Sequence, residues 1–422
     1  MSRNKSLRGK LTLVAIVVLM LVMTACGGNS KESANASEGA ESSPSSSENG
    51  SSDGNAAPDS DNPNAQWALD VGLDKTETTD ELYELAKKEG KVVVYSQSSR
   101  IKDVKASFEE KYPGITVEGY KMSSPEIVEK VIREQESKVW NSDVIFVKDS
   151  SGSVSNEMIK KGMVHKYLPT DIQSTMMEPF KSSSPGLVMY FSVRTIYYNN
   201  EVYDEPPITN WWDLTDPKWK GKVLVDDPIQ SSDTMDLFLS FVQHADEMAE
   251  AYKEKFGKEI VLDGTDNAGY EFFKQLFAND VVLVKSSDEA VEAVGAKGQD
   301  NPPIAIAAAS KLREVEEKGL KVGASWEVKP RLSVKGPAYL YVTNEAEHPN
   351  AAKLFIRWMA GEVDGTGKGF EPYNVSGSYS TRPNVVREDN VPLDQLKLWD
   401  YDSDYFYNNY VKFREFWIKS VS

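Results

Sequence analysis

The stretch from Lys91 to Arg100 constrains the fold of this chain more than any other. It opens with a short apolar run rich in β-branched residues and changes abruptly to hydroxyl side chains, and from Ile101 to Tyr112 apolar residues recur at helical spacing. This order indicates a buried strand, a polar turn and an amphipathic helix. In an open parallel sheet, the turn after a strand faces the ligand side, and the next helix directs its free N–H groups there. The candidate ligand-binding residues of this turn are Ser96, Ser98, Ser99 and Arg100.

Two further strands end in similar turns. Residues 115–120 read as a short strand before a capped helix start, and residues 143–147 read as a buried strand before the polar turn at 148–153. Strand and helix thus alternate three times, which is typical of a parallel sheet with right-handed crossovers. The candidate binding residues from these two turns are Ser123, Ser124, Ser150 and Ser151.

The second half of the chain repeats the pattern after a change of character at residues 185–199. This long β-prone stretch exceeds the usual strand length, so we expect it to run from one lobe into a second. Strands at 223–225, 281–284 and 304–307 follow, and residues 332–334 and 338–342 read as the return crossing. The candidate binding residues here are Arg194, Ser231, Ser232, Thr234, Ser310, Lys311 and Trp326.

Each of these candidates has a purely structural alternative. The serines are also good helix caps, Arg194 could form a structural ion pair, and Trp326 could be buried in a core. Tyr197 and Tyr198 are adjacent on the crossing stretch and read as core aromatics, because neighbouring strand residues point to opposite faces. The aromatic-rich helix expected at 401–417 is also interpreted as core packing.

The first 25 residues are typical of an export signal. Four basic residues precede a short apolar run that ends in small residues at Cys26, the single cysteine among 422 residues. Met23–Cys26 resembles a bacterial lipobox, which implies cleavage before Cys26 and lipid attachment to it. The alternative is an ordinary signal, or a signal-anchor, with an incidental cysteine. Residues 26–66 are rich in Ser, Gly, Asn and acidic residues, so we expect a disordered tether.

Length and charge narrow the possible partners. About 355 residues follow the tether, more than one core usually organises, so two lobes are expected. The signal holds four basic and no acidic residues, so its removal takes the net charge from −17 to −21. A chain this acidic is not expected to bind nucleic acid or an anionic lipid surface directly.

Several motifs in order carry a family resemblance. Residues 88–96, 108–117, 198–199, 212–222 and 348–356 resemble the extracytoplasmic solute-binding proteins of ABC importers, specifically the ferric-iron-type subgroup. The resemblance implies a two-lobe (type II) periplasmic-binding-protein fold of the α/β class, with two crossing strands, that closes on a solute and presents it to a permease. The expected boundaries are 1–25 for the lipoprotein signal peptide, 26–66 for the tether, 67–190 for the first part of lobe 1, 191–332 for lobe 2, and 333–422 for the return into lobe 1 and the C-terminal helices.

The resemblance leaves the solute open. Its iron-binding members are expected to use adjacent tyrosines after a second-lobe strand, where this chain has Ala308–Lys311. Ferric ion prefers anionic oxygen ligands, which neutral hydroxyls do not replace. Hydroxyls at helix starts with a lysine and an arginine instead favour a small oxyanion on an organic molecule, such as a phosphate ester, phosphonate, sulfonate or carboxylate. Ferric-iron capture with unusual ligands remains the alternative.

An exported hydrolase is the alternative from another class. The Ser-x-x-Lys at Ser99–Lys102 lacks the partner motifs of penicillin-recognising enzymes, and the three histidines show no metal spacing. The sequence therefore predicts a binding protein without catalytic residues, cofactor or metal. We expect a monomer whose partners are a small solute, an ABC permease and, through a lipid on Cys26, the outer face of the cytoplasmic membrane.

Overall fold

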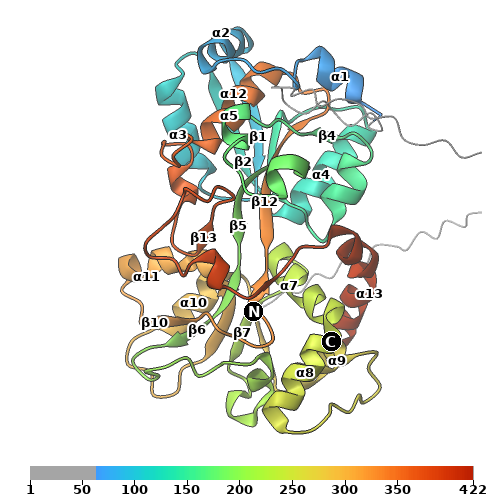
Figure 1. Cartoon of the computed structure of the whole chain (residues 1–422), viewed down its shortest axis with the longest axis vertical. Coiled ribbons are helices and arrows are strands. Elements are labelled where there is room, and N and C mark those ends of the chain that lie inside the picture. Colours follow the sequence, from blue (N-terminus) through green and yellow to red (C-terminus); the bar gives the residue numbers. More distant parts are fainter. Residues whose placement is uncertain (1–62, 422) are drawn as a thin grey trace, which may run out of the picture. The chain divides into compact units, whose positions relative to one another are not determined.

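The computed structural model describes residues 63–421. The predicted signal peptide, Cys26 and the tether up to residue 62 lie outside these residues. The first described helix, α1 (Ala65–Asp70), begins within the last residues assigned to the tether. The remainder of the described chain forms two large sheets with helices around them, joined by the strands that cross between them (Figure 1), and a small two-stranded sheet.

A seven-stranded sheet forms the first lobe, in the order β13-β5-β12-β3-β1-β2, with β4 also paired to β12. The predicted parallel pairing is confirmed for the part built from β2, β1 and β3. The whole sheet is mixed, because β12 runs antiparallel to both β3 and β5. The strands are β1 (Lys91–Ser96), β2 (Thr116–Lys121), β3 (Val144–Lys148), β4 (Val164–His165), β5 (Leu187–Ser192), β12 (Gly336–Thr343) and β13 (Ser378–Tyr379).

The helices of the first lobe begin and end where local signals place them. Helix α2 starts with a reciprocal capping box between Thr78 and Glu81 and ends at Gly90, whose φ is 73°. Helix α3 buries Ile101, Val104 and Phe108 against the sheet. The helices are α2 (Thr79–Glu89), α3 (Ile101–Lys111), α4 (Ser124–Glu136), the π-helix η1 (Val154–Ile159), α5 (Thr170–Gln173), α6 (Phe180–Ser183), α12 (Pro349–Ala360) and the short η5 (Glu371–Tyr373).

The expected long crossing strand is divided in two. Strand β5 belongs to the first sheet and β6 (Arg194–Asn199) to the second, with Val193 between them. The carbonyl of Val193 accepts a hydrogen bond from the N–H of Ala309, at 3.0 Å, instead of continuing the first sheet. The chain returns through β11 (Ser333–Val334) into β12. The two-lobe α/β fold with two crossings is therefore confirmed.

A five-stranded sheet forms the second lobe, in the order β10-β6-β9-β7-β8. Its strands are β6, β7 (Val223–Asp226), β8 (Val282–Val284), β9 (Ile304–Ala308) and β10 (Val322–Ser325). Its helices are η2 (Trp211–Thr215), η3 (Pro217–Trp219), α7 (Ser232–Gln243), α8 (Ala245–Phe256), α9 (Ala268–Ala278), α10 (Ser287–Gly295), η4 (Ala309–Leu312) and α11 (Arg313–Lys318).

The C-terminal segment packs as the sequence predicts. Helix α13 (Ser403–Val421) buries Phe406, Phe413 and Trp417, and Trp417 lies with its ring centroid 5.4 Å from that of Phe238 on α7. Before it, β14 (Leu398–Trp399) pairs with β11, and η6 (Leu393–Gln395) lies in the irregular segment between β13 and β14. The aromatic residues of the C-terminal helix therefore form core.

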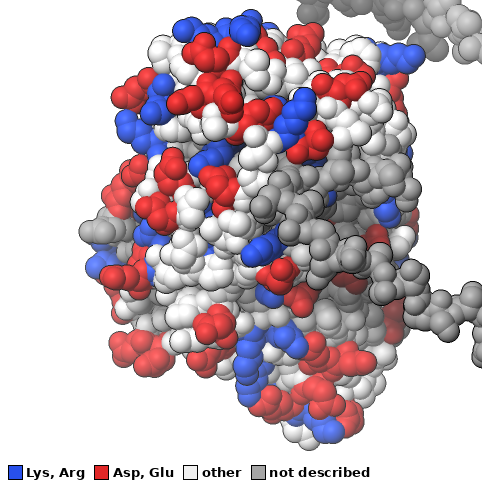
Figure 2. All heavy atoms as spheres, turned by 45° about the horizontal axis from the view of Figure 1, so that its top comes forward, with Lys and Arg blue, Asp and Glu red and all other residues white. Residues whose placement is uncertain are grey.

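Basic and acidic side chains are interspersed over the face shown in Figure 2. Within residues 63–421, the helices are all too short or too polar to span a bilayer.

Candidate functional site

Lys148, the last residue of β3, joins the two lobes. Its amine donates hydrogen bonds to the Ser192 hydroxyl on the crossing strand and to the Asp233 carboxylate on α7. Ser192 also donates to Asp233 at 3.2 Å, and Lys148 is 5% exposed. Sequence reasoning placed Lys148 in the third polar turn but did not select it. A lysine closing a buried apolar strand was the available signal, because a buried amine needs polar partners.

The third and fourth predicted turns meet beside this lysine. The Ser150 and Ser232 hydroxyls lie 3.4 Å apart, and the Ser151 hydroxyl donates to Asp236 at 3.0 Å. A cavity of about 260 Å³ lies between these turns and helix α4. The structure thus brings Ser150, Ser151 and Ser232 together from opposite lobes.

Ser231 and Thr234 lie next to this contact but serve the start of α7. The Ser231 hydroxyl accepts from the Thr234 N–H, and the Thr234 hydroxyl donates to it at 3.0 Å. Both hydroxyls therefore make helix-capping contacts, which is the structural role that the sequence offered as the alternative to ligand binding.

The first turn is held by its own serines. The Ser96 hydroxyl donates to the Ser98 carbonyl and accepts from the Ser98 N–H, both at 3.1 Å, and Ser98 accepts from the Arg100 N–H at 3.3 Å. Ser99 is exposed. These contacts fix the turn and leave the Arg100 side chain as its charged group.

Arg100 is a partly buried cation without a carboxylate partner. Its guanidinium donates to the Pro372 carbonyl at 2.9 Å and lies 5.5 Å from the Tyr373 ring centroid. Among residues 63–421, no carboxylate lies within ion-pair distance of it. Burial lowers the pKa of Arg100, and the charge of Arg313 in the second lobe acts in the same direction. A bound anion at this place would offset both effects.

Ser124 connects the first three turns. Its hydroxyl donates to the Gln97 side-chain oxygen at 3.2 Å and accepts from the Lys148 N–H at 3.1 Å. The Gln97 side-chain nitrogen is buried and has no partner among the described residues. Ser123 instead forms a capping box with Glu126, to which its hydroxyl donates at 2.8 Å.

Aromatic residues lie on the face of the crossing strand β5 that carries Ser192. The Tyr190 and Tyr373 rings are stacked at 6.0 Å between centroids and 19° between planes, and Phe146 packs edge-on against Tyr373 at 5.2 Å. Tyr190 lies two residues before Ser192 and therefore on the same strand face. Sequence reasoning missed this cluster, because Tyr373 comes from a distant segment with no strand or helix period.

Arg194 is enclosed in the second lobe. It is 2% exposed, pairs with the Asp226 carboxylate, and donates to the Ile306 carbonyl at 2.9 Å. Its charge is therefore already balanced by a carboxylate.

Lys311 is similarly balanced. It pairs with Asp288 and lies 3.5 Å from Glu314, while the Ser310 carbonyl accepts from the Arg313 guanidinium at 2.6 Å. Trp326 is partly buried and packs on the core. The Ala308–Lys311 turn reaches the lobe interface through its backbone, since Gly377 approaches it closely.

The adjacent tyrosines are core residues. Tyr197 is fully buried, and its hydroxyl donates to the carbonyls of Ala308 and Ala309 at 3.0 and 2.9 Å. Burial raises the pKa of Tyr197, which disfavours a phenolate ligand. Within residues 63–421, no group of three or more His, Cys, Asp or Glu side chains is placed to hold a metal ion.

Two carboxyl groups at the lobe contact are strongly affected by burial. Burial raises the pKa of Asp149 to about 6. Burial and the charge of Asp233 raise the pKa of Asp236 well above its usual range. These acids therefore carry less negative charge than their number implies, while Arg100 keeps an unpaired positive charge.

Comparison with known proteins identifies the family of this chain. Residues 103–396 match the family of bacterial extracellular solute-binding proteins. The chain belongs to this family. For solute-binding proteins of the ABC-importer type, the partners implied are a small solute and an ABC permease. None of the curated proteins matches the chain.

Solved structures of periplasmic binding proteins share the fold of this solute-binding protein. They include the periplasmic binding protein P5PA, at 18% identity over 79% of this chain and all of that one, with a TM-score of 0.60. Iron-bound HitA from Pseudomonas aeruginosa matches at 16% identity over 77% of this chain and 99% of that one, with a TM-score of 0.61. AfuA from Actinobacillus pleuropneumoniae, with fructose-6-phosphate bound, matches at 19% identity over 78% of this chain and 98% of that one, with a TM-score of 0.60.

Proposed function

We propose that this chain is a lipid-anchored extracellular solute-binding protein that captures an organic molecule bearing an oxyanion and delivers it to an ABC importer. The class of solute is a phosphate ester, phosphonate, sulfonate or carboxylate. The observation that carries the proposal is Arg100, a partly buried guanidinium beside two stacked tyrosines with no carboxylate partner among the described residues. Arginine recognises planar and tetrahedral oxyanions through paired N–H donors, and the loss of water around it strengthens such contacts.

The groups around Arg100 suit the rest of such a solute. The unpartnered Gln97 amide nitrogen is a free donor, and the Tyr190 and Tyr373 rings offer a flat apolar surface. Arg313 lies near Arg100 from the opposite lobe, but its charge is balanced by an ion pair with Glu314. The fructose-6-phosphate bound to AfuA, a structure of the same fold, is an example of a solute that combines an oxyanion with a polar body.

The predicted serines belong to this proposal in two groups. Ser98 and Ser99 flank Arg100 in the first turn, while Ser150, Ser151 and Ser232 lie at the closing contact beside Lys148. Residues with mainly structural contacts complete the set as supports of the turns: Ser96, Ser123, Ser124, Arg194, Ser231, Thr234, Ser310, Lys311 and Trp326.

The alternatives have less support. Ferric-iron capture, as in iron-bound HitA, requires anionic ligands, and Tyr197 and Tyr198 are buried and unsuited to that role. An exported hydrolase requires an activated nucleophile that neither the motifs nor the described contacts supply.

The solute class is tested by thermal shift and calorimetry. The purified chain is screened against sugar phosphates, phosphonates, sulfonates and carboxylates, and molecules released on denaturation are identified by mass spectrometry. Arg100→Gln should weaken binding about tenfold or more, because it removes a charge-assisted contact. Arg133→Gln is the matched control, since its side chain on α4 is 70% exposed. Equal affinity of the two variants, a coloured iron complex on adding ferric salt, or turnover of an ester substrate would refute the proposal.

The anchor and the monomeric state need separate tests. Cys26→Ser should abolish incorporation of labelled fatty acid and release the chain into the medium. Light scattering coupled to size-exclusion chromatography should give the mass of one chain. Retention of the Cys26→Ser variant on membranes would contradict lipid anchoring while leaving the solute proposal intact.

A further inference from the structure

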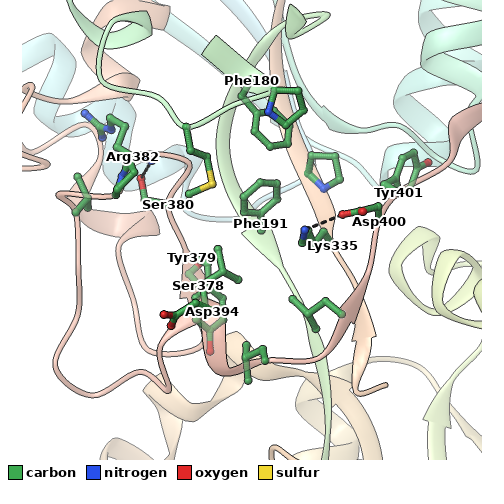
Figure 3. A pocket seen from close by; sticks show the side chains of 18 of the residues that line it. Phe180, Phe191, Lys335, Ser378, Tyr379, Ser380, Arg382, Asp394, Asp400 and Tyr401 are labelled. Atoms are coloured by element: carbon green, nitrogen blue, oxygen red, sulfur yellow. Dashed lines mark hydrogen bonds and ion pairs between the residues drawn. The ribbon is translucent and has the colours of Figure 1, made fainter. Parts of the chain in front are cut away.

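A second cavity lies on the opposite face of the crossing strands from Lys148. Phe191 and Ser192 are neighbours on β5 and therefore point to opposite faces. Ser192 contacts Lys148 and Asp233, whereas Phe191 lines a cavity of about 1230 Å³ (Figure 3). This volume exceeds the roughly 300–1,000 Å³ typical of small-molecule sites.

The cavity is roofed by the irregular segment between β13 and β14. This segment, residues 380–397, contributes Val385, Val391 and Leu393 to the lining, to which Phe180 and Phe191 also belong. The three aliphatic side chains pack only partly against the core. Apolar side chains from these segments thus line the cavity among charged ones such as Glu178 and Asp394 and do not fill it, which leaves room for a ligand with an apolar body.

A buried hydroxyl in the wall lacks a partner. Tyr379, on β13, is 5% exposed, lines the cavity (Figure 3) and is paired with Phe191, so its side chain lies on the same sheet face as Phe191. Its hydroxyl has no hydrogen-bond partner among the described residues. Buried hydroxyls are nearly always bonded, so this group points to an occupant or an ordered water.

Lys335 is one of five cations that line the cavity, together with Arg331, Arg382, Arg387 and Lys397. Lys335, on the return crossing just before β12, lies beside Phe191 and directs its amine to Asp400 at 2.7 Å (Figure 3). The Asp400 side chain is 89% exposed, so water screens the attraction between Lys335 and Asp400 and the ion pair is weak. The anionic group of a ligand can replace Asp400 at little cost.

We propose that this cavity is a second small-molecule site, separate from the solute site, that takes an amphipathic anion: an aliphatic or aromatic body between Phe191 and the 380–397 segment, with its carboxylate or sulfonate on Lys335. The proposal does not depend on the identity of the transported solute.

The test uses the purified full chain, with dodecanoate below its micellar concentration and its uncharged analogue dodecanol as probes. Binding is followed by calorimetry and by displacement of the fluorescent dye 8-anilino-1-naphthalenesulfonate. Val391→Trp and Leu393→Trp each partly fill the cavity at the place expected for the apolar body and should each weaken dodecanoate binding at least tenfold. Val261→Trp, at a position 79% exposed, is the control and should bind like the parent. Two filling variants are used so that a folding defect in one, detected by circular dichroism, does not remove the test.

The role of Lys335 has its own readout. Lys335→Gln should weaken dodecanoate severalfold and leave dodecanol unchanged, whereas Arg100→Gln should affect neither probe. Binding of dodecanoate that is unchanged in both filling variants, or no binding to the parent, would overturn the site. Equal loss of dodecanoate and dodecanol in Lys335→Gln would overturn the assignment of the anionic group.

Discussion

Replacing Asp149 with asparagine should change how the stability of this solute-binding protein depends on pH. The Asp149 carboxyl follows β3, is 3% exposed, and accepts hydrogen bonds from the N–H and hydroxyl of Ser155 at 2.8 and 2.9 Å. Burial raises the pKa of Asp149 from its usual 3.8 to about 6, although the Ser155 donors pull it down. Desolvation therefore outweighs the hydrogen bonds.

The sign follows from where the proton is held more tightly. Between about pH 4 and 6 the folded chain binds more protons at Asp149 than the unfolded chain, so the free energy of unfolding falls as the pH rises. A shift of about two pKa units, at about 1.4 kcal/mol each, amounts to about 3 kcal/mol. Asparagine does not ionise, so the variant escapes this loss. Its free energy of unfolding relative to the parent should rise by about 3 kcal/mol between about pH 4 and 7.

Urea denaturation followed by tryptophan fluorescence, at several pH values in this window, measures the difference directly. Using the difference cancels the titration of distant groups. Neutralising Asp149 also removes a charge that raises the pKa of Asp236, which acts in the same direction. Ser155→Ala, which removes a donor that lowers the pKa, should move the window to higher pH. A difference between Asp149→Asn and parent that stays constant across the window would refute the reasoning.

Three further outcomes follow from particular contacts. Arg194→Met leaves a buried carboxylate without its partner and should lower the free energy of unfolding by about 3–5 kcal/mol in urea; an unchanged midpoint would contradict a structural ion pair. Lys148→Met removes the amine that pairs with Asp233 across the two lobes, so the lobes should open more often. Small-angle scattering should then give a larger radius of gyration than for the parent, and an identical scattering curve would argue against this contact. Gly377→Ala should cost about 1–3 kcal/mol, because φ is 77° and a Cβ would lie 2.2 Å from a carbonyl oxygen of the second lobe. Gly264→Ala, at a φ of 75° with open space, should cost less, and equal losses would discount the close approach.

The sequence predicted the elements whose signal is local. The strand at Lys91–Ser96 and the helix at Ile101–Lys111 lie where the apolar period places them, because burial on one face imposes that period. The long stretch at 185–199 was correctly assigned to a crossing between lobes. Its division at Val193 was not predicted, because it depends on a hydrogen bond to Ala309, more than a hundred residues away.

The candidate site shows the same limit. Hydroxyls at strand ends were visible in the sequence, and Ser150, Ser151 and Ser232 do meet between the lobes. What the sequence does not encode locally is which charges find partners. The sequence offers both Arg194 and Arg100 as candidate cations for an anionic ligand. In the structure Arg194 is paired with a carboxylate and Arg100 is not.

The two faces of β5 connect the proposed sites physically. Ser192 takes part in the contact between lobes, and the adjacent Phe191 forms the wall of the second cavity, so a change in the backbone of this strand moves both side chains. Among the described residues, the chain passes between the lobes through this strand, through the return crossing that carries Lys335, and through the 380–397 segment that leads to α13 on the second lobe. A molecule held against Phe191 and Lys335 therefore contacts the segments that must bend when the lobes open. If this molecule binds the open and closed arrangements with different affinities, it shifts the equilibrium between them. It then changes the affinity for the solute by some factor, and the solute changes the affinity of the second site by the same factor.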